Sequence, residues 1–139
     1  AEEPPLFTEL ASAEMKYILL QAAALHRVSE KKYPRILDEV KSFLDRNFLK
    51  SPSNAAIAAK FGYHPYYLNQ LFCTQFGKTL HSYITQKKIR LACTLLLSSD
   101  MSVSDIADAC GFTGTAWFSE TFKRCMGVSP LEYRRRARR

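Results

Sequence analysis

IADACGFTGTAWFSETFKRCMG, residues 106–127, decides the fold of this chain because it repeats an earlier segment, IAAKFGYHPYYLNQLFCTQFG, residues 57–77. Each copy begins with an Ile-Ala pair, reaches a glycine after a few residues, spaces its apolar residues helically and ends in a second glycine. The offset between the copies is 49 residues up to the first glycine and 50 afterwards, so one residue is inserted in the second turn. Each copy predicts a short helix, a glycine turn and a longer amphipathic helix, which is the pattern of a helix-turn-helix.

Gly, Pro and Ser divide the rest of the chain into further helices, and no segment alternates apolar and polar residues with period two. We expect a helix from about 34 to 48, a long connecting helix from about 79 to 97, and a last helix that opens at Ser129-Pro130. Ser102 and Ser129, each followed three residues later by an acid, indicate capping boxes. The predicted fold class is all-α, with two helix-turn-helix subdomains joined by a long connecting helix, plus an N-terminal helix.

The first thirty residues have a character of their own. Residues 10–28 hold no Gly or Pro and are rich in helix-forming residues, with an apolar seam over two heptads. Two heptads are fewer than a coiled coil needs, so self-association through this helix and packing on its own or another domain both stay open. We divide the chain into a helical segment and linker, 1–30, and a domain, 31–139, with subdomains at about 34–78 and 101–139 around a connecting helix at about 79–98.

Charge is distributed unevenly over the 139 residues. Residues 1–30 hold five acids and two bases, whereas residues 31–139 hold 18 bases and eight acids. A basic domain favours an anionic partner, most often nucleic acid. The alternative interpretation is solubility alone, because many small domains carry several net charges.

The four cysteines do not indicate a metal or catalytic site. Their gaps of 20, 17 and 15 residues lack the close ligand pairs of zinc sites, so no metal and no cofactor is expected. We expect free thiols in a reducing compartment. No apolar run is long enough for a membrane span and no signal peptide is recognisable. The chain does not begin with Met, and we expect it to be a fragment or a processed chain.

The outer faces of the two longer helices are candidates for reading DNA. We expect an inner face of Leu68, Leu71, Phe72 and Phe76 in the first copy, and of Trp117, Phe118, Thr121 and Phe122 in the second. Major-groove readers need short or planar polar groups near a helix N-terminus. The predicted base contacts are Tyr66, Asn69, Gln70, Thr115, Ala116 and Glu120. Asn69 and Gln70 can each pair bidentately with adenine, and Glu120 can accept from the cytosine amino group.

Most contacts between a protein and DNA are made to the phosphate backbone. The predicted backbone contacts are basic side chains and the cap of the connecting helix: Lys60, Lys78, Thr79, His81, Lys88, Arg90, Lys123, Arg124, Arg134 and Arg135. The terminal arginines are the densest charge of the chain, and their alternative interpretation is a solvated chain end.

The stretch SVSDIADACGFTGTAWFSETFKRCMGVSPLEYR, residues 102–134, resembles the signature of the AraC/XylS family of bacterial transcription regulators. The matching positions are Ala107, Gly111-Phe112, Trp117-Phe118, Phe122-Lys123, Gly127, Ser129-Pro130 and Tyr133-Arg134. The resemblance covers residues 34–136 and includes the connecting helix. So dense a motif in its expected helical context is specific.

The resemblance implies a sequence-specific activator in the bacterial cytoplasm, at the nucleoid, whose recognition helices enter successive major grooves about 34 Å apart. It also implies contact with RNA polymerase. Family members often carry Arg at the positions of Glu120 and Lys88. A carboxylate that faces phosphates weakens non-specific attraction, so Glu120 implies either weak binding by the second subdomain or the reading of cytosine. In longer members a ligand-binding, dimerising domain precedes this module. Residues 6–28 resemble its last helix, so no effector pocket is expected in this chain, and a homodimer would form through residues 10–28 or through that missing domain.

Two alternative functions are a thiol-dependent enzyme and a helical interaction module. A thiol-dependent enzyme would need a nucleophile and a base in a recognisable motif, and none is present. A helical interaction module would use residues 10–28 for assembly.

Overall fold

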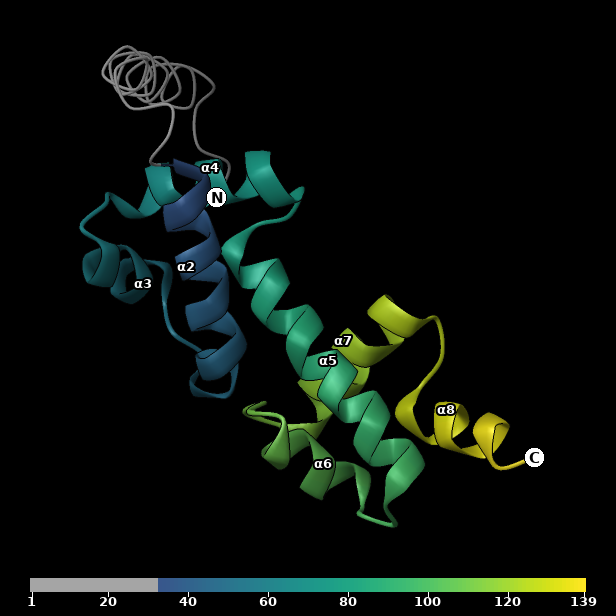
Figure 1. Cartoon of the computed structure of the whole chain (residues 1–139). Coiled ribbons are helices and arrows are strands. Elements are labelled where there is room, and N and C mark those ends of the chain that lie inside the picture. Colours follow the sequence, from purple (N-terminus) through teal and green to yellow (C-terminus); the bar gives the residue numbers. More distant parts are fainter. Residues whose placement is uncertain (1–32) are drawn as a thin grey trace, which may run out of the picture. The chain divides into compact units, whose positions relative to one another are not determined.

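The computed structural model describes residues 33–139, and it is helical throughout that range, with no strand (Figure 1). The elements are α2 (Tyr33–Asn47), the 3-10 helix η1 (Phe48–Lys50), α3 (Asn54–Phe61), α4 (Pro65–Phe76), α5 (Leu80–Ser98), α6 (Val103–Ala109), α7 (Thr115–Met126) and α8 (Pro130–Ala137). The predicted helix at 10–28 and its linker lie outside the described residues. Contacts divide the chain after Glu39, and the packing reported below is that of Val40–Arg139.

The first helix-turn-helix is α3 and α4. The Ser53 side chain accepts a hydrogen bond from the Ala56 N–H at 3.1 Å and so caps α3. Gly62 follows α3 with φ +75°, a left-handed conformation that glycine adopts without steric cost. Pro65 then occupies the first turn of α4, where its missing N–H is not needed.

The second helix-turn-helix, α6 and α7, repeats this construction. The Ser102 side chain caps α6 by accepting from the Asp105 N–H at 3.0 Å, and Gly111 turns the chain at φ +78°. Two residues separate Gly111 from the α7 cap Gly114, whereas one residue separates Gly62 from the α4 cap His64. The inserted residue predicted from the offset therefore lies in the second turn, and the repeat is confirmed.

The connecting helix α5 contributes to the cores of both subdomains. Near its N-terminus, Leu80 is fully buried, and Tyr83 packs edge-on against Phe72 of α4 with ring centroids 5.4 Å apart. In its second half, Ile89, Ala92 and Leu96 join one cluster of buried side chains with residues of α6, the turn and α7: Ile106, Ala107, Cys110, Phe112, Phe118 and Phe122. Figure 1 shows α5 running from α4 at one end to α6, α7 and α8 at the other. Each subdomain thus depends on the same rod for part of its core.

Trp117 departs from the predicted inner face of α7. Phe118, Thr121 and Phe122 are buried as expected, but Trp117 is 42% exposed. Its ring packs edge-on against Phe112 with centroids 5.1 Å apart. Phe118 and Phe122 already fill the stripe that faces the core, and position 117 lies at the edge of that stripe, so the indole remains at the surface.

In each predicted capping box, the bond accepted by the serine side chain is present, and no described bond joins the acid side chain to the serine N–H. Ser129 caps α8 by accepting from the Glu132 N–H at 3.2 Å, as Ser102 caps α6. The Glu132 carboxylate pairs with Arg135 and with Arg136, whose Nε lies 3.0 Å away. These i+3 and i+4 arginines hold the acid at the opening of α8, and the hydrogen bond from Arg136, joined by the Arg135 charge, lowers the pKa of Glu132.

Candidate nucleic-acid interface

The structure places the two predicted reading faces at the same point of the two motifs. On α4, Tyr66 is exposed and Gln70 is half-buried, while Leu68 and Phe72 face the core. On α7, Thr115, Ala116 and Glu120 are exposed, while Phe118 and Phe122 face the core. Among these readers only Thr115 has a side-chain hydrogen bond, donated to Ser104 Oγ at 3.2 Å. Both faces therefore present polar groups within the first two turns of a helix, where a helix in a major groove makes its base contacts.

Asn69 has a structural task that the sequence pattern did not indicate. Its Oδ1 accepts a hydrogen bond at 3.0 Å from the N–H of Leu80, the first residue of α5. This bond holds the amide toward the start of α5, and bidentate pairing with adenine would need the same oxygen together with the amide N–H. The adenine contact predicted for Asn69 competes with this bond and stays a prediction, whereas the side-chain amide of Gln70 makes no hydrogen bond among the described residues.

Lys88 is buried, which argues against the phosphate contact predicted for it. It is 5% exposed, and its Nζ donates to Ser51 Oγ and, at 3.0 Å, to the carbonyl oxygen of Gly111. Burial lowers the pKa of its ammonium. The helical pattern suggested a solvent face, but α5 at this point is enclosed by both subdomains.

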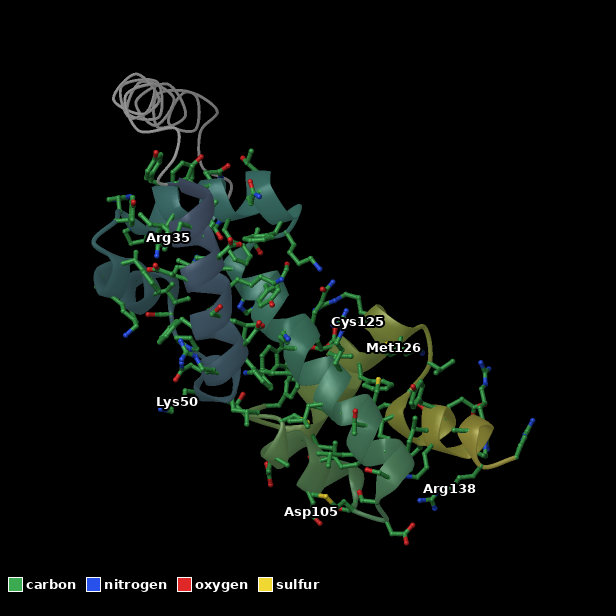
Figure 2. The ribbon with its side chains drawn as sticks, in the orientation of Figure 1. Arg35, Lys50, Asp105, Cys125, Met126 and Arg138 are labelled. Atoms are coloured by element: carbon green, nitrogen blue, oxygen red, sulfur yellow. The ribbon has the colours of Figure 1, made fainter. Side chains whose placement is uncertain are left out.

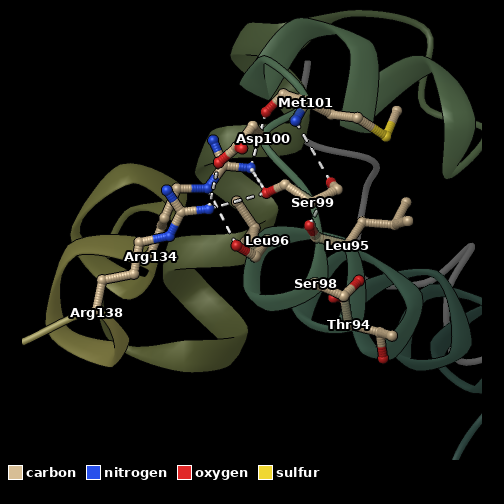
Figure 3. A network of polar contacts seen from close by, with 9 residues as sticks. All are labelled: Thr94, Leu95, Leu96, Ser98, Ser99, Asp100, Met101, Arg134 and Arg138. Carbon is tan, nitrogen blue, oxygen red and sulfur yellow. Dashed lines mark hydrogen bonds and ion pairs between the residues drawn. The ribbon is translucent and has the colours of Figure 1, made fainter.

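Arg134 is also used internally (Figure 3). Its guanidinium donates to three backbone carbonyls around the end of α5: Leu96 at 3.1 Å, Ser99 at 3.3 Å and Met101 at 2.8 Å. Arg138 adds bonds to the Ser99 carbonyl at 3.1 Å and to Asp100 at 2.7 Å. These arginines satisfy carbonyls that a helix C-terminus leaves without partners, so Arg134 has a structural task that its predicted phosphate contact did not include.

The other predicted backbone contacts fall into an engaged and an open group. Thr79 caps α5 through the Ser82 N–H at 3.1 Å, Lys78 donates to Gln86 Oε1 at 2.5 Å, and Arg135 pairs with Glu132. Lys60 lies over the Phe43 ring, with Nζ 5.0 Å from the centroid, and stays exposed. The open group comprises exposed bases whose side chains form no hydrogen bond or ion pair within residues 33–139: His81, Arg90, Lys123 and Arg124.

A family model described as a helix-turn-helix domain matches residues 57–136, a span that holds both glycine-turn units and α5. The chain is also similar to a solved transcriptional regulator from Chromobacterium violaceum described as AraC-type, with 28% identity, a TM-score of 0.66, and coverage of 73% of this chain and 90% of that one. This chain belongs to the AraC/XylS family of transcription regulators.

Other members of the AraC/XylS family show the same relationship. The transcriptional regulator ExsA of Pseudomonas aeruginosa is 26% identical over 136 residues, which cover 96% of this chain and 49% of ExsA. The virulence regulon transcriptional activator VirF of Yersinia enterocolitica is 27% identical over 138 residues, which cover 94% of this chain and 49% of VirF. This chain therefore spans about half the length of these two relatives.

One similar structure was solved with DNA. The DNA-binding domain of AdpA, in complex with a target DNA, is 28% identical to this chain with a TM-score of 0.68, and the match covers 74% of this chain and 95% of that domain. The all-α architecture with two helix-turn-helix units is thus that of the AraC/XylS DNA-binding domain.

The junction of the two units of this AraC-type module includes residues that sequence reasoning missed. Leu49 of η1 and Ser51 lie against the Gly111 turn and Lys88. Beside them is a groove of about 590 Å³, lined in part by Ser51, Lys88, Gly111, His81 and Trp117. The positive φ of Ser51, +49°, is the only such value at a non-glycine residue among those described, and sequence spacing gives no signal of it.

A second polar cluster links α2 to α5. Tyr83 donates to Asp45, and Lys87 pairs with the same carboxylate at 3.0 Å. Burial opposes the charge of Asp45, but the hydrogen bonds from Tyr83 and Lys87 outweigh it and hold the pKa of this carboxyl below its usual value. Burial and the Asp45 hydrogen bond raise the pKa of Tyr83. The cluster fixes the start of α5 against subdomain 1.

Among the described residues, no group of three His, Cys, Asp or Glu side chains is arranged to hold a metal ion. The four cysteines are free, with Cys110 buried and Cys125 exposed on α7 (Figure 2). None of the helices in residues 33–139 combines the length and apolar character that crossing a bilayer requires.

We expect the thiols to differ strongly in reactivity. Burial raises the pKa of Cys110 to about 11, so at pH 8 roughly one molecule in a thousand carries the thiolate there. Iodoacetamide at pH 8 should alkylate Cys125 at least about 100-fold faster than Cys110, since only the thiolate reacts and Cys110 is also shielded. Peptide mass spectrometry over a time course measures both rates. Rapid alkylation of Cys110 in the folded chain would favour the alternative interpretation, that the chain is a thiol-dependent enzyme.

Proposed function

We propose that this chain is the DNA-binding module of a transcriptional activator, and that it inserts α4 and α7 into successive major grooves on one face of DNA. The observation that carries the proposal is the paired arrangement: two helices occupy the same place in two copies of one motif, and each buries its apolar face and exposes a polar one. A structural helix without a ligand has no need to repeat this division at equivalent positions. The similarity to the DNA-bound AdpA domain supports the same docking mode.

The proposed readers are those whose polar atoms stay available. On α4 these are Tyr66 and Gln70, and on α7 they are Thr115, Ala116 and Glu120. Gln70 suits adenine, the Ala116 methyl suits a thymine methyl, and the Glu120 carboxylate accepts from the cytosine amino group. Because a carboxylate is repelled by phosphates, Glu120 restricts α7 to sites where cytosine offsets that repulsion.

The proposed phosphate contacts are the bases that remain open, His81, Arg90, Lys123 and Arg124, together with Lys60 and the exposed Arg139. These contacts fix the register of the module on DNA without reading its sequence. The subdomain boundaries at about 34–78 and 101–139 follow as part of the same proposal, since each would carry one recognition helix.

Activation and assembly are proposals for the longer protein. VirF is named a transcriptional activator, and this chain covers about half of it. We propose that the module, once bound in the bacterial cytoplasm, places RNA polymerase next to it. Dimerisation would then come from residues 10–28 or from a further regulatory domain, and effector binding from that further domain.

The experiment that tests the function begins with selection of bound duplexes from random DNA, followed by gel-shift titration at increasing salt. Because each neutralised phosphate releases counterions, five or six contacts predict that log K falls with log salt at a slope of about −5. Random duplex of equal length is the control and should bind with a similar slope but lower affinity. Failure to enrich any sequence, or a slope near zero, contradicts the proposal.

Substitutions at Gln70 and Asn69, two adjacent amides, should separate a loss of DNA reading from a loss of stability. Gln70→Ala should lower affinity for the selected duplex on the order of tenfold, about 1–2 kcal/mol, with little change on random DNA. Asn69→Ala should lower the melting temperature instead, because it removes the cap acceptor of α5 at a cost of about 1 kcal/mol. Gel shifts and thermal melts on both variants make the comparison. Equal effects of the two on specific binding would remove the distinction.

A further inference from the structure

The two subdomains touch directly beside α5, through backbone atoms. A Cβ built on Gly111 would lie 2.8 Å from the carbonyl oxygen of Leu49, closer than real Cβ atoms approach. Gly62, the equivalent residue of the first copy, has no atom within 4 Å of the same position. The absence of a side chain at Gly111 therefore lets the second turn lie against η1.

Lys88 joins the same two segments from the middle of α5. Its Nζ donates to Ser51 Oγ, directly after η1, and to the carbonyl oxygen of Gly111 at 3.0 Å. The ammonium also lies 5.4 Å from the centroid of the Phe112 ring. One buried cation is thus bonded to an atom of each subdomain.

Ser51 is held in a conformation that its side chain does not favour. Its φ of +49° is left-handed, a conformation that is disfavoured for a residue with a β-carbon and that the surrounding structure must hold. In this conformation its N–H bonds the Phe48 carbonyl at 3.1 Å and its hydroxyl meets Lys88. The end of η1 is therefore fixed as an acceptor for the ammonium.

A rigid α5 by itself does not fix the angle between the recognition helices. Each subdomain packs on one stretch of the rod, and tilting of either one about its packing surface would move α4 relative to α7. Two helices that read successive grooves must keep a spacing of about 34 Å and the matching rotation. A third attachment, off the axis of the rod, removes that freedom.

We propose that Lys88 is a positioning residue that fixes the angle between the two reading helices and so sets the spacing between DNA segments that the module accepts. The proposal rests on the proposed function. A buried cation is a costly way to gain stability but an effective way to specify one arrangement, because its bonds are lost if either partner moves. Apolar packing alone would tolerate a tilt of one subdomain on α5 better than these directed bonds do.

The structural test measures the junction without DNA. Nitroxide labels are placed through Thr74→Cys on α4 and Lys123→Cys on α7, in a chain that also carries Cys73→Ser and Cys125→Ser. Double electron–electron resonance then reports the distance distribution between the helices. We expect one narrow distribution with Lys88, a distribution at least about twice as wide with Lys88→Met, and a narrow one again with Lys88→Arg, which keeps the charge and the donors.

The functional test uses the duplex selected by the wild-type chain and its derivatives with one base pair inserted or deleted between the two protected segments. Wild type and Lys88→Arg should lose at least about 30-fold in affinity on each derivative, and Lys88→Met less than about threefold. The control is Lys50→Met, which removes an exposed charge next to Ser51 and should behave as wild type (Figure 2).

Ser51→Ala keeps the test decisive if Lys88→Met does not fold. It removes the acceptor of subdomain 1 and leaves the bond to Gly111, so it should widen the distribution and relax the spacing penalty in part. A narrow distribution with the full spacing penalty in Lys88→Met, or in Ser51→Ala if the former is unfolded, overturns the proposal. Absence of DNA selection by the wild-type chain would contradict the proposed function instead, and the resonance measurement would still decide the role of Lys88.

Discussion

Gly111→Ala should destabilise the chain by about 2–5 kcal/mol, from strain of about 1–2 kcal/mol at a left-handed residue and overpacking of about 1–3 kcal/mol. The residue has φ +78°, and its new Cβ would meet the Leu49 carbonyl oxygen at 2.8 Å. The atom in the way belongs to the backbone, so it cannot move aside as a flexible side chain would. Relief would require η1 and the turn to separate, which would also pull Gly111 away from Lys88.

Gly62→Ala is the matched control because it occupies the equivalent turn at φ +75° with open space around the new Cβ. It should cost only the conformational strain, about 1–2 kcal/mol. Urea unfolding of the three chains gives both differences, with equal m-values as the check that the transition stays two-state. If the two variants lose the same stability, the close approach at Gly111 has no energetic consequence and the junction is looser than described.

Arg134→Ala should cost about 3 kcal/mol, because it leaves the carbonyls of Leu96 and Met101 without their charged donor and that of Ser99 with Arg138 alone, and hydrogen bonds to charged groups contribute about 1.5–3 kcal/mol each before water replaces some of them. The carbonyls of Leu96, Ser99 and Met101 surround the point where α5 ends and the second subdomain begins. Loss of the guanidinium therefore loosens the entry into α6. Thermal melts should show a drop on the order of 10 degrees for a domain of this size.

Arg134→Lys should restore little of that stability, since one ammonium cannot reproduce the planar fork that reaches carbonyls on two sides. Arg139→Ala is the control: it removes an exposed charge from the same chain end and should leave the melting temperature within about 1 degree while weakening DNA binding on all sequences. A stable Arg134→Ala variant that has lost DNA affinity would instead support the phosphate contact predicted for Arg134.

Arg134 and Arg135 show how much of the partners of the terminal arginines could be predicted from the sequence. Density of charge predicted phosphate contact for Arg134 and Arg135 alike. Arg134 faces the end of α5, whereas Arg135, one residue on, is 67% exposed on its side chain and pairs with Glu132. Adjacent helical residues point about 100° apart, so neighbours in a charged run can have unrelated partners.

The repeat, the helices and their ends were determined by the sequence itself. Gly62 and Gly111 adopt the left-handed conformation in the two turns. Ser53 and Ser102 cap the N-termini of α3 and α6, the helices that lead into these turns, and the inserted residue lies in the second turn. These features depend on residues within a few positions of one another, and their physics is local: backbone freedom, a side-chain acceptor and apolar spacing.

Only the tertiary structure decided which polar side chains face outward to a ligand and which are used within the fold. Asn69 bonds a residue 11 positions away, Lys88 one 23 away and Arg134 one 38 away. Each had been expected to contact DNA, because periodicity shows that a residue leaves the core face of its own helix. It cannot show which distant N–H or carbonyl the packing of other helices brings opposite that residue, and a buried backbone group without a partner is costly enough to claim the side chain.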